Sequence, residues 1–473
     1  VGAMFGAHLR LRRLNVVGGI SLLAQVALIV SVIWAVILVK NSDENFPELI
    51  RKVRPAGHCL CETSTTFDCQ WTRKQQQQQH ASGHAQEAQT ANAMEEEWEF
   101  QPGRDDWDLA MNESKCNTAF PGLFEEVYRA VAWRAQQATN VSQADLDAIK
   151  IERGRVRVMI VDGKIRVLEA SHSFDDHRKR ALAALYAIHR AIAADPKAIP
   201  NLEFIMSVDD MVDTPDQPVW ALTRRAQDQN LWIMPDFGFW SWDIADVGTM
   251  DDVTEQIVND EATMGWQGKI PKLVWRGTTK MLPKLRGALL DRSRSKSWSD
   301  VEPLQPGHPP ENYLGAAEQC RYMFLIHAEG RSYSGSLKYR QLCRSVIITH
   351  KLQWIQHHHY LLVANGTDQN YVEVERDFSD LETKMEYLLS HPEEAKQIAD
   401  NNVKTFRERY FTPAADACYW RALIHAWAAS SFEPEVYETT PEGLVRQRGM
   451  RFENFVLIKT EDQMQFKWNN NKV

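Results

Sequence analysis

The sequence predicts an α/β fold behind a single N-terminal transmembrane helix. Three observations lead to this prediction. The chain has 473 residues, enough for about two or three domains. From residue 272 onward, apolar runs of strand length alternate with segments of helical periodicity, which is typical of parallel α/β sheets. Residues 16–39, by contrast, form one apolar stretch without a charged side chain.

The N-terminal stretch, VVGGISLLAQVALIVSVIWAVILV, is long enough to cross a membrane. As a helix its 24 residues would extend about 36 Å, against about 30 Å for a bilayer core. Three arginines lie between residues 10 and 13, so we expect residues 1–15 in the cytosol and the rest of the chain in the lumen. A signal peptide is the alternative, although no A-x-A cleavage site stands out. Residues 40–95 include a polar, glutamine-rich segment and predict a flexible stem.

Charge and cysteine content narrow the class of protein. A formal net charge of −9 and a pI near 6.0 argue against a nucleic-acid binder. In an oxidising lumen the seven cysteines are expected to form structural disulfides. Because seven is odd, at least one thiol is free or pairs with another chain. The cysteines are Cys59, Cys61, Cys69, Cys116, Cys320, Cys343 and Cys418.

The first half of the globular region predicts a hairpin, a helix and a strand. Residues 155–169 alternate apolar and polar side chains around an Asp162-Gly163 turn. A helical segment follows, with Ser173 as its N-cap and Asp195-Pro196 at its end. The apolar run from residue 202 to 208 then predicts a buried strand.

The second half predicts strands that are each followed by a helix. Because ligands bind at the carboxyl ends of parallel strands, the polar residues that follow each strand are the candidates for function. The predicted strands lie within 272–277, 320–330 and 345–350, and the closing helices within 380–390, 393–409 and 413–428.

Two acids, Asp209 and Asp210, follow the strand at 202–208 directly. One interpretation is a general base that takes a proton from an attacking hydroxyl. A second is a metal clamp on a diphosphate, and a third is an ordinary capped turn. The residues alone leave these three alternatives open.

Two later strand ends carry residues that suit a diphosphate. In WRGTTK and the helix after it, guanidinium groups can bind phosphate in a fork, and glycine lets backbone N–H groups approach oxygen closely. The segment HAEGRSYSGSLK places small residues before a helix and adds a lysine, but it lacks the G-K-[ST] ending of a P-loop. The candidate donor-binding residues are Arg276, Gly277, Thr278, Arg286, Gly330, Ser332, Ser334, Ser336 and Lys338.

Other candidates are less specific. Trp240 and Trp242 could stack on a sugar acceptor, and Asp243 and Asp209 could bind its hydroxyls, although core packing explains the tryptophans equally well. The run His357–His359 predicts a solvated surface segment, because three adjacent side chains cannot point the same way to bind metal.

Several ordered motifs between about residues 200 and 430 resemble the capsule-associated glycosyltransferase family, which includes fungal capsule xylosyltransferases and Rumi-type protein O-glucosyltransferases. They are IMSVDD, LVWRGTTK followed by KLR, CRYMFLIHAEGRSYSGSLKYRQLCRSVII, and ACYW at 417–420. The resemblance implies a GT-B architecture, with two Rossmann-like lobes and a cleft between them. We therefore expect an acceptor and catalytic lobe at 96–265, a nucleotide-sugar lobe at 266–430 and an extension at 431–473.

The resemblance also implies roles for residues. The catalytic aspartate of the family falls on Asp210, and its two donor-binding segments fall on Arg276–Thr278 and Gly330–Lys338. Three positions depart from the animal members: Thr278 replaces serine, Glu329 replaces arginine, and Ser336 replaces an arginine within the second loop.

Together these observations predict a membrane-anchored inverting glycosyltransferase of the Golgi or endoplasmic reticulum. It would transfer xylose or glucose from a UDP-sugar to a hydroxyl of a glycan or protein, without metal or cofactor. The alternatives are a non-catalytic carbohydrate-binding ectodomain and a metal-dependent GT-A transferase that uses Asp209 and Asp210 as its clamp.

Overall fold

The computed structural model describes residues 98–171, 175–244, 247–307 and 309–458, all within one compact unit. The predicted anchor at 16–39, the tail before it and the stem after it lie outside this part of the chain, as do residues 459–473. Within the described ranges, no helix combines the length and the apolar character needed to span a bilayer.

The N-terminal sheet is mixed and contains the predicted hairpin. Its six strands lie in the order β15-β2-β1-β3-β4-β5. The predicted Asp162-Gly163 turn is confirmed: both residues have positive φ and join β1 to β2 as a hairpin, whose strands are antiparallel by necessity. β3 also runs antiparallel to β1, and only β3, β4 and β5 are parallel. The bounds are β1 Arg155–Val161, β2 Lys164–Ala170, β3 Leu202–Ser207, β4 Trp220–Ala221, β5 Trp232–Ile233 and β15 Met450–Arg451.

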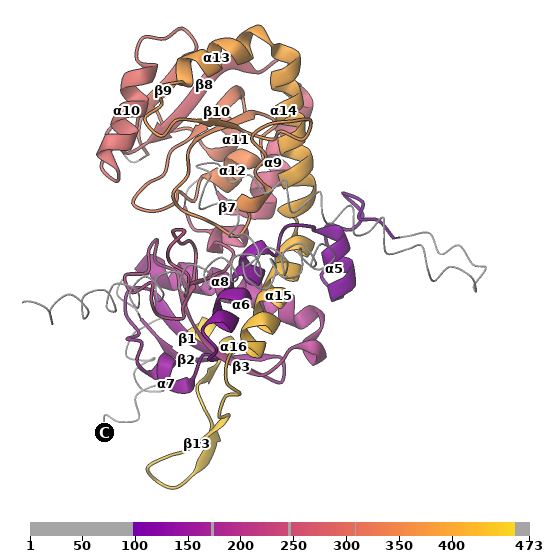
Figure 1. Ribbon diagram of the computed structural model, residues 1–473, viewed down its shortest axis with the longest axis vertical. Helices are drawn as coiled ribbons and strands as arrows, with labels where there is room; N and C mark the ends of the chain where they lie inside the picture. Colours follow the sequence, from indigo (N-terminus) through magenta and orange to yellow (C-terminus); the bar gives the residue numbers. More distant parts are fainter. Residues whose placement is uncertain (1–97, 172–174, 245–246, 308, 459–473) are drawn as a thin grey trace, which may run out of the picture. The chain divides into compact units, whose positions relative to one another are not determined.

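The C-terminal sheet confirms the predicted parallel arrangement. Its five strands lie in the order β12-β11-β10-β8-β9, and all neighbours are parallel. α10 packs on β9 and α14 on β11, so helices accompany this sheet (Figure 1). Its strands are β8 Ile270–Gly277, β9 Ser299–Pro303, β10 Tyr322–His327, β11 Val346–His350 and β12 Val372–Val374.

The helices fall close to the predicted segments. The longest are α8, α15, α9 and α14, and the second predicted closing segment, 393–409, continues from α14 into the short π-helix η4. The bounds are α5 Glu113–Ala119, α6 Glu125–Gln136, α7 Gln143–Asp147, α8 Asp175–Ala194, η2 Phe237–Phe239, α9 Met250–Met264, α10 Pro283–Ser293, α11 Ala316–Gln319, α12 Leu337–Gln341, η3 His359–Leu361, α13 Leu381–Ser390, α14 Pro392–Thr405, η4 Phe406–Tyr410, α15 Pro413–Ala429 and α16 Phe452–Leu457. Two small ribbons complete the fold, β6 Ser241–Trp242 with β7 Gly248–Thr249, and β13 Tyr437–Thr439 with β14 Val445–Gln447.

The end of the chain returns to the N-terminal sheet. α15 packs against α6 and α8 (Figure 1), and the indole of Trp427 donates a hydrogen bond to the carbonyl oxygen of Glu203 in β3. β15 then pairs with the edge strand β2. The predicted boundary after residue 265 falls between the strands β1–β5 and the strands β8–β12, while β15, which lies after residue 430, adds a strand to the first sheet.

Two disulfides confirm that cysteines of this chain are structural. Cys116 in α5 bonds to Cys418 in α15, and Cys320 bonds to Cys343. The first bond joins segments that are 302 residues apart in the sequence. Cys59, Cys61 and Cys69 lie outside the described residues.

The histidine run is buried, and the prediction of a solvated segment is wrong. His357, His358 and His359 are each at most 4 % exposed. Their rings pack edge-on against aromatic neighbours, among them Phe239 and Phe411. The run enters the short helix η3, so successive side chains reach different parts of the core instead of water.

Candidate active site

The turn after β3 and the loop after β10 touch each other. The hydroxyl of Ser332 donates a hydrogen bond of 2.6 Å to the backbone carbonyl oxygen of Asp210. The two residues are 122 positions apart in the sequence and belong to segments that follow different sheets. The predicted acid and the second predicted donor loop are therefore brought together.

Asp209 and Asp210 play different structural parts in their turn. The Asp209 carboxylate accepts the backbone N–H of Asp210 at 2.7 Å and lies mostly buried near His177. The Asp210 side chain is 46 % exposed, and its Oδ1 atom lies 3.0 Å from Nη1 of Arg180 in α8. Asp209 thus shapes the turn, while Asp210 presents an oriented carboxylate.

Arg180 was not among the residues singled out in the sequence. Its guanidinium lies 4.9 Å from the centre of the Phe237 ring and also pairs with Asp176 at 2.9 Å. Burial works to lower the pKa of Arg180, but Asp210 and Asp176 outweigh it and raise that pKa. The arginine is therefore a permanent cation beside Asp210.

Lys338 does not present a free ammonium to a ligand, contrary to the prediction. It is 2 % exposed, and its Nζ atom lies 2.8 Å from Oδ1 of Asp236 and 2.8 Å from the carbonyl oxygen of Gly335. α12, the helix it belongs to, has only five residues, too few to provide the predicted anion site at a helix N-terminus.

Asp236 gathers several residues from the loop after β10. Besides Lys338, its carboxylate accepts a hydrogen bond from the hydroxyl of Tyr333, and the hydroxyl of Tyr339 donates to the nearby carbonyl oxygen of Gly238. Burial would raise the pKa of Asp236, but Lys338 and Tyr333 hold it below its usual value. No sequence motif pointed to Asp236, because its partners lie about a hundred positions later.

The side chains that hold the loop after β8 already have hydrogen-bond and ion-pair partners within the protein. The Arg276 guanidinium pairs with Asp300 at 2.7 Å and donates to three backbone carbonyl groups, so its charge is already matched. A Cβ atom at Gly277 would lie 2.5 Å from the ring of Trp275, which explains the glycine there. The carbonyl oxygen of Thr278 accepts a 2.6 Å hydrogen bond from Arg286.

Arg286 connects the two predicted donor loops. It also donates to the carbonyl oxygens of Glu329 and Ala328, and a Cβ atom at Gly330 would lie 3.2 Å from its Nη2 atom. Burial lowers the pKa of Arg286. Further along the same loop the hydroxyl groups of Ser334 and Ser336 lie 3.0 Å apart.

The acceptor-side candidates differ from one another in exposure and in their partners. Trp240 stacks on Tyr186 with 5.7 Å between ring centres and carries Arg190 over its face. Trp242 is partly buried, with Lys338 5.6 Å from its ring centre. Asp243 is exposed and pairs with Lys179. In the part of the chain that the structure describes, no cluster of three His, Cys, Asp or Glu side chains is arranged to hold a metal ion.

The family model of glycosyl transferase family 90 matches residues 117–451, which is most of the chain and contains all three strand ends. The chain belongs to glycosyl transferase family 90.

Curated relatives of this family 90 chain are distant in sequence. An O-glucosyltransferase rumi homolog from Aedes aegypti is 22 % identical over 48 % of this chain and 63 % of its own length. A protein with the same description from Anopheles gambiae is 24 % identical over 35 % of this chain and 43 % of its own. Protein O-glucosyltransferase 2 from Danio rerio is 22 % identical over 49 % of this chain and 48 % of its own. The matched region thus spans about half the length of these relatives.

Glu329, directly after β10, has a structural role in this family 90 chain. The Glu329 carboxylate is buried and accepts the backbone N–H groups of Gln353 and Trp354, both at 2.9 Å, and pairs with Arg376. Glu329 therefore anchors the loop after β10 to the segment after β11.

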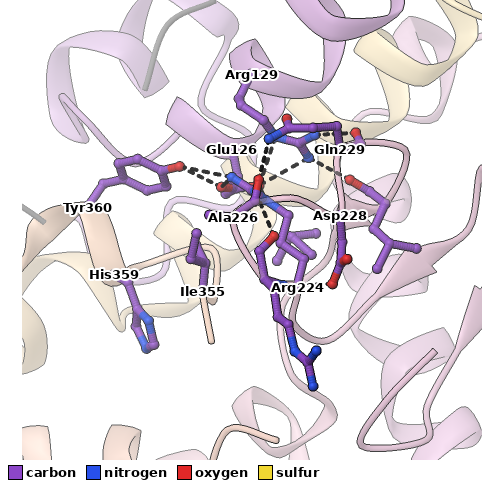
Figure 2. A network of polar contacts seen from close by, with 12 residues as sticks. Glu126, Arg129, Arg224, Ala226, Asp228, Gln229, Ile355, His359 and Tyr360 are labelled. Carbon is purple, nitrogen blue, oxygen red and sulfur yellow. Dashed lines mark hydrogen bonds and ion pairs between the residues drawn. The ribbon is translucent and has the colours of Figure 1, made fainter. Parts of the chain in front are cut away.

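A buried charge cluster fixes α6 to two later segments of the chain (Figure 2). The Glu126 carboxylate pairs with Arg224 at 2.7 Å and Arg129 at 3.1 Å and accepts the hydroxyl of Tyr360 at 2.6 Å. Burial alone would raise the pKa of Glu126, but the two arginines hold it at about 2. Arg129 also donates to the carbonyl oxygens of Gln229 and Leu231. All its members are compensated internally, so we assign the cluster to stability and not to binding.

Proposed function

We propose that this chain is an inverting glycosyltransferase that transfers xylose or glucose from a UDP-sugar to a hydroxyl of a glycan or protein. The observation that carries the proposal is the contact between Ser332 and Asp210, because it puts a partly exposed carboxylate beside the glycine-serine loop. Family membership supports the class of reaction. The relatives' names mention glucose, and the resemblance to capsule enzymes favours xylose, so both donors are candidates.

In the proposed mechanism Asp210 acts as the general base. Its carboxylate takes the proton from the acceptor hydroxyl as the oxygen attacks the anomeric carbon from the face opposite the diphosphate. The bond between that carbon and the diphosphate oxygen breaks, and UDP leaves with the bonding electrons. Arg286, beside Gly330, stabilises the negative charge that develops on the diphosphate. No metal is required in this scheme, because guanidinium groups supply the positive charge.

The cellular compartment and the membrane anchor are part of the same proposal. Two disulfides in the described residues support a compartment of the secretory pathway, since such bonds persist under oxidising conditions. We propose anchoring in the Golgi or endoplasmic reticulum membrane through residues 16–39, with the catalytic region in the lumen.

The test is UDP release by the purified full-length chain against a panel of UDP-sugars, with and without glycan and glycoprotein acceptors. Wild type is expected to release UDP from UDP-xylose or UDP-glucose, and to do so in EDTA. Asp210→Asn should lower kcat at least about 1,000-fold, because general-base catalysis and an oriented charge are both lost, while UDP binding stays within a factor of a few. Asp216→Asn, which removes an exposed carboxylate from the same segment, is the matched control. Full turnover in Asp210→Asn would refute the assignment.

A further inference from the structure

Two buried arginines beside the loop after β10 have no carboxylate partner among the residues that the structure describes. Arg286 donates only to backbone carbonyl oxygens, those of Thr278, Ala328 and Glu329. Arg340 in α12 donates to the hydroxyl of Ser336 at 2.5 Å. Across the described ranges neither guanidinium forms an ion pair, whereas Arg276 and Lys338 both do. Their positive charges are therefore not matched by a carboxylate in the described part of the chain.

Arg340 is the more unusual of the two. It is 4 % exposed, and its Nε atom has no hydrogen-bond partner. Burial, followed by the nearby charge of Arg286, lowers the pKa of Arg340 to about 10. His327, the last residue of β10, lies near the same charges: burial and then Arg340 hold its pKa well below the usual value. An unmatched guanidinium in a protein interior is unfavourable, and an anion would relieve it.

We propose that Arg340 is a further donor-binding residue, which together with Arg286 binds the diphosphate of the nucleotide sugar beside the Gly330–Ser336 loop. This inference rests on the proposed function. The Arg340 guanidinium donates to the hydroxyl of Ser336, which lies in this loop. The guanidinium thus reaches the loop from four residues later in the chain. Two guanidinium groups match the charge and the paired oxygens of a diphosphate.

The inference is tested by calorimetric titration of the full-length chain with UDP and with uridine at fixed ionic strength. Arg340→Met should weaken UDP binding about 10- to 100-fold, the usual contribution of a hydrogen bond to a charged group, and leave uridine binding unchanged. Arg340→Lys should retain part of the affinity. Ser336→Arg combined with Arg340→Met should restore it, because the charge returns to the loop. Arg292→Met, which removes an exposed cation from α10 outside the proposed site, is the matched control and should bind UDP like wild type.

Thermal unfolding of the free variants separates binding from a structural role. Arg340→Met replaces an unmatched buried charge by an apolar side chain of similar length, so its unfolding temperature should equal or exceed that of wild type. A lower unfolding temperature would assign the guanidinium a structural role and overturn the inference. So would wild-type affinity for UDP in Arg340→Met, or an equal loss of uridine and UDP binding. A wild-type chain that binds UDP while Arg340→Met is unaffected refutes only this inference, whereas a wild-type chain that binds no nucleoside diphosphate refutes the proposed function as well.

Discussion

Arg180 holds the Asp210 carboxylate from a helix 30 residues earlier in the chain. We expect Arg180→Met to lower kcat about 10- to 100-fold with little change in the KM of the donor, because a misoriented base affects the proton transfer more than donor binding. Initial rates of UDP release at varied donor concentration separate the two constants. Arg180→Lys should retain part of the rate, since it keeps the charge but not the geometry.

Asp176→Asn is the control for Arg180. Asp176 is the other carboxylate partner of Arg180 and is largely exposed, so its removal leaves the contact with Asp210 in place. It should react at nearly the wild-type rate. A wild-type kcat in Arg180→Met would show that the arginine does not orient the base.

The sequence located the strand ends but not the charges that surround them. Asp210 and the loop at Gly330 could be predicted to meet, because both follow apolar strands in an α/β pattern. The ion pairs of Lys338 and Arg276 could not be predicted. The carboxylates that neutralise them, Asp236 and Asp300, belong to no local motif and lie 102 and 24 residues away in the sequence. Arg340 likewise becomes a candidate donor-binding residue only once the structure shows that, among the described residues, its guanidinium has no carboxylate partner.

The buried histidines between the end of β11 and the start of η3 make the stability of the folded protein depend on pH. His350, His357, His358 and His359 are buried, and burial lowers the pKa of each, to about 3 for His350 and His357. Below pH 6.5 the unfolded chain binds protons that the folded protein cannot, so the free energy of unfolding must fall as the pH falls. We expect a loss of about 1 kcal/mol per histidine between pH 7.5 and 5.5, measured by chemical denaturation.

His358→Phe should make this pH dependence less steep. The His358 ring lies edge-on to Phe406 and Phe411, and neither of its nitrogens has a hydrogen-bond partner, so a phenyl ring suits the site. His391→Phe, at an exposed position, is the control and should keep the wild-type slope. The same slope in all three proteins would contradict the explanation.

The types of most elements could be predicted from the sequence, but the full order of strands in the N-terminal sheet could not. The hairpin at Asp162-Gly163 and the parallel strands β8, β10 and β11 follow from turn chemistry and apolar runs. β4 and β5 have only two residues each, too few for any periodicity to appear. The burial of the histidine run was also hidden, because histidine tolerates water and aromatic surroundings equally.

At the scale of the whole molecule, Asp236 and Lys338 join the segment after β5 to the helix after β10. We expect Asp236→Asn to lower the free energy of unfolding by about 3 kcal/mol or more, because it leaves a buried ammonium without its counter-charge. Adding Lys338→Met should recover part of this loss, since the double variant buries no charge. Urea denaturation of wild type, both single variants and the double variant completes a double-mutant cycle. Additive effects would show that the pair is not coupled.

The return of α15 to the first sheet also constrains the order of events during synthesis. Three aromatic side chains of α15, Tyr419, Trp420 and Trp427, are buried in the same hydrophobic core as that sheet. The disulfide between Cys116 and Cys418 also joins α15 to α5. A ribosome must synthesise the chain beyond residue 427 before these side chains are available. The nascent region of the first sheet therefore keeps apolar surface uncovered until α15 emerges, and only then can the oxidation that joins α5 to α15 take place.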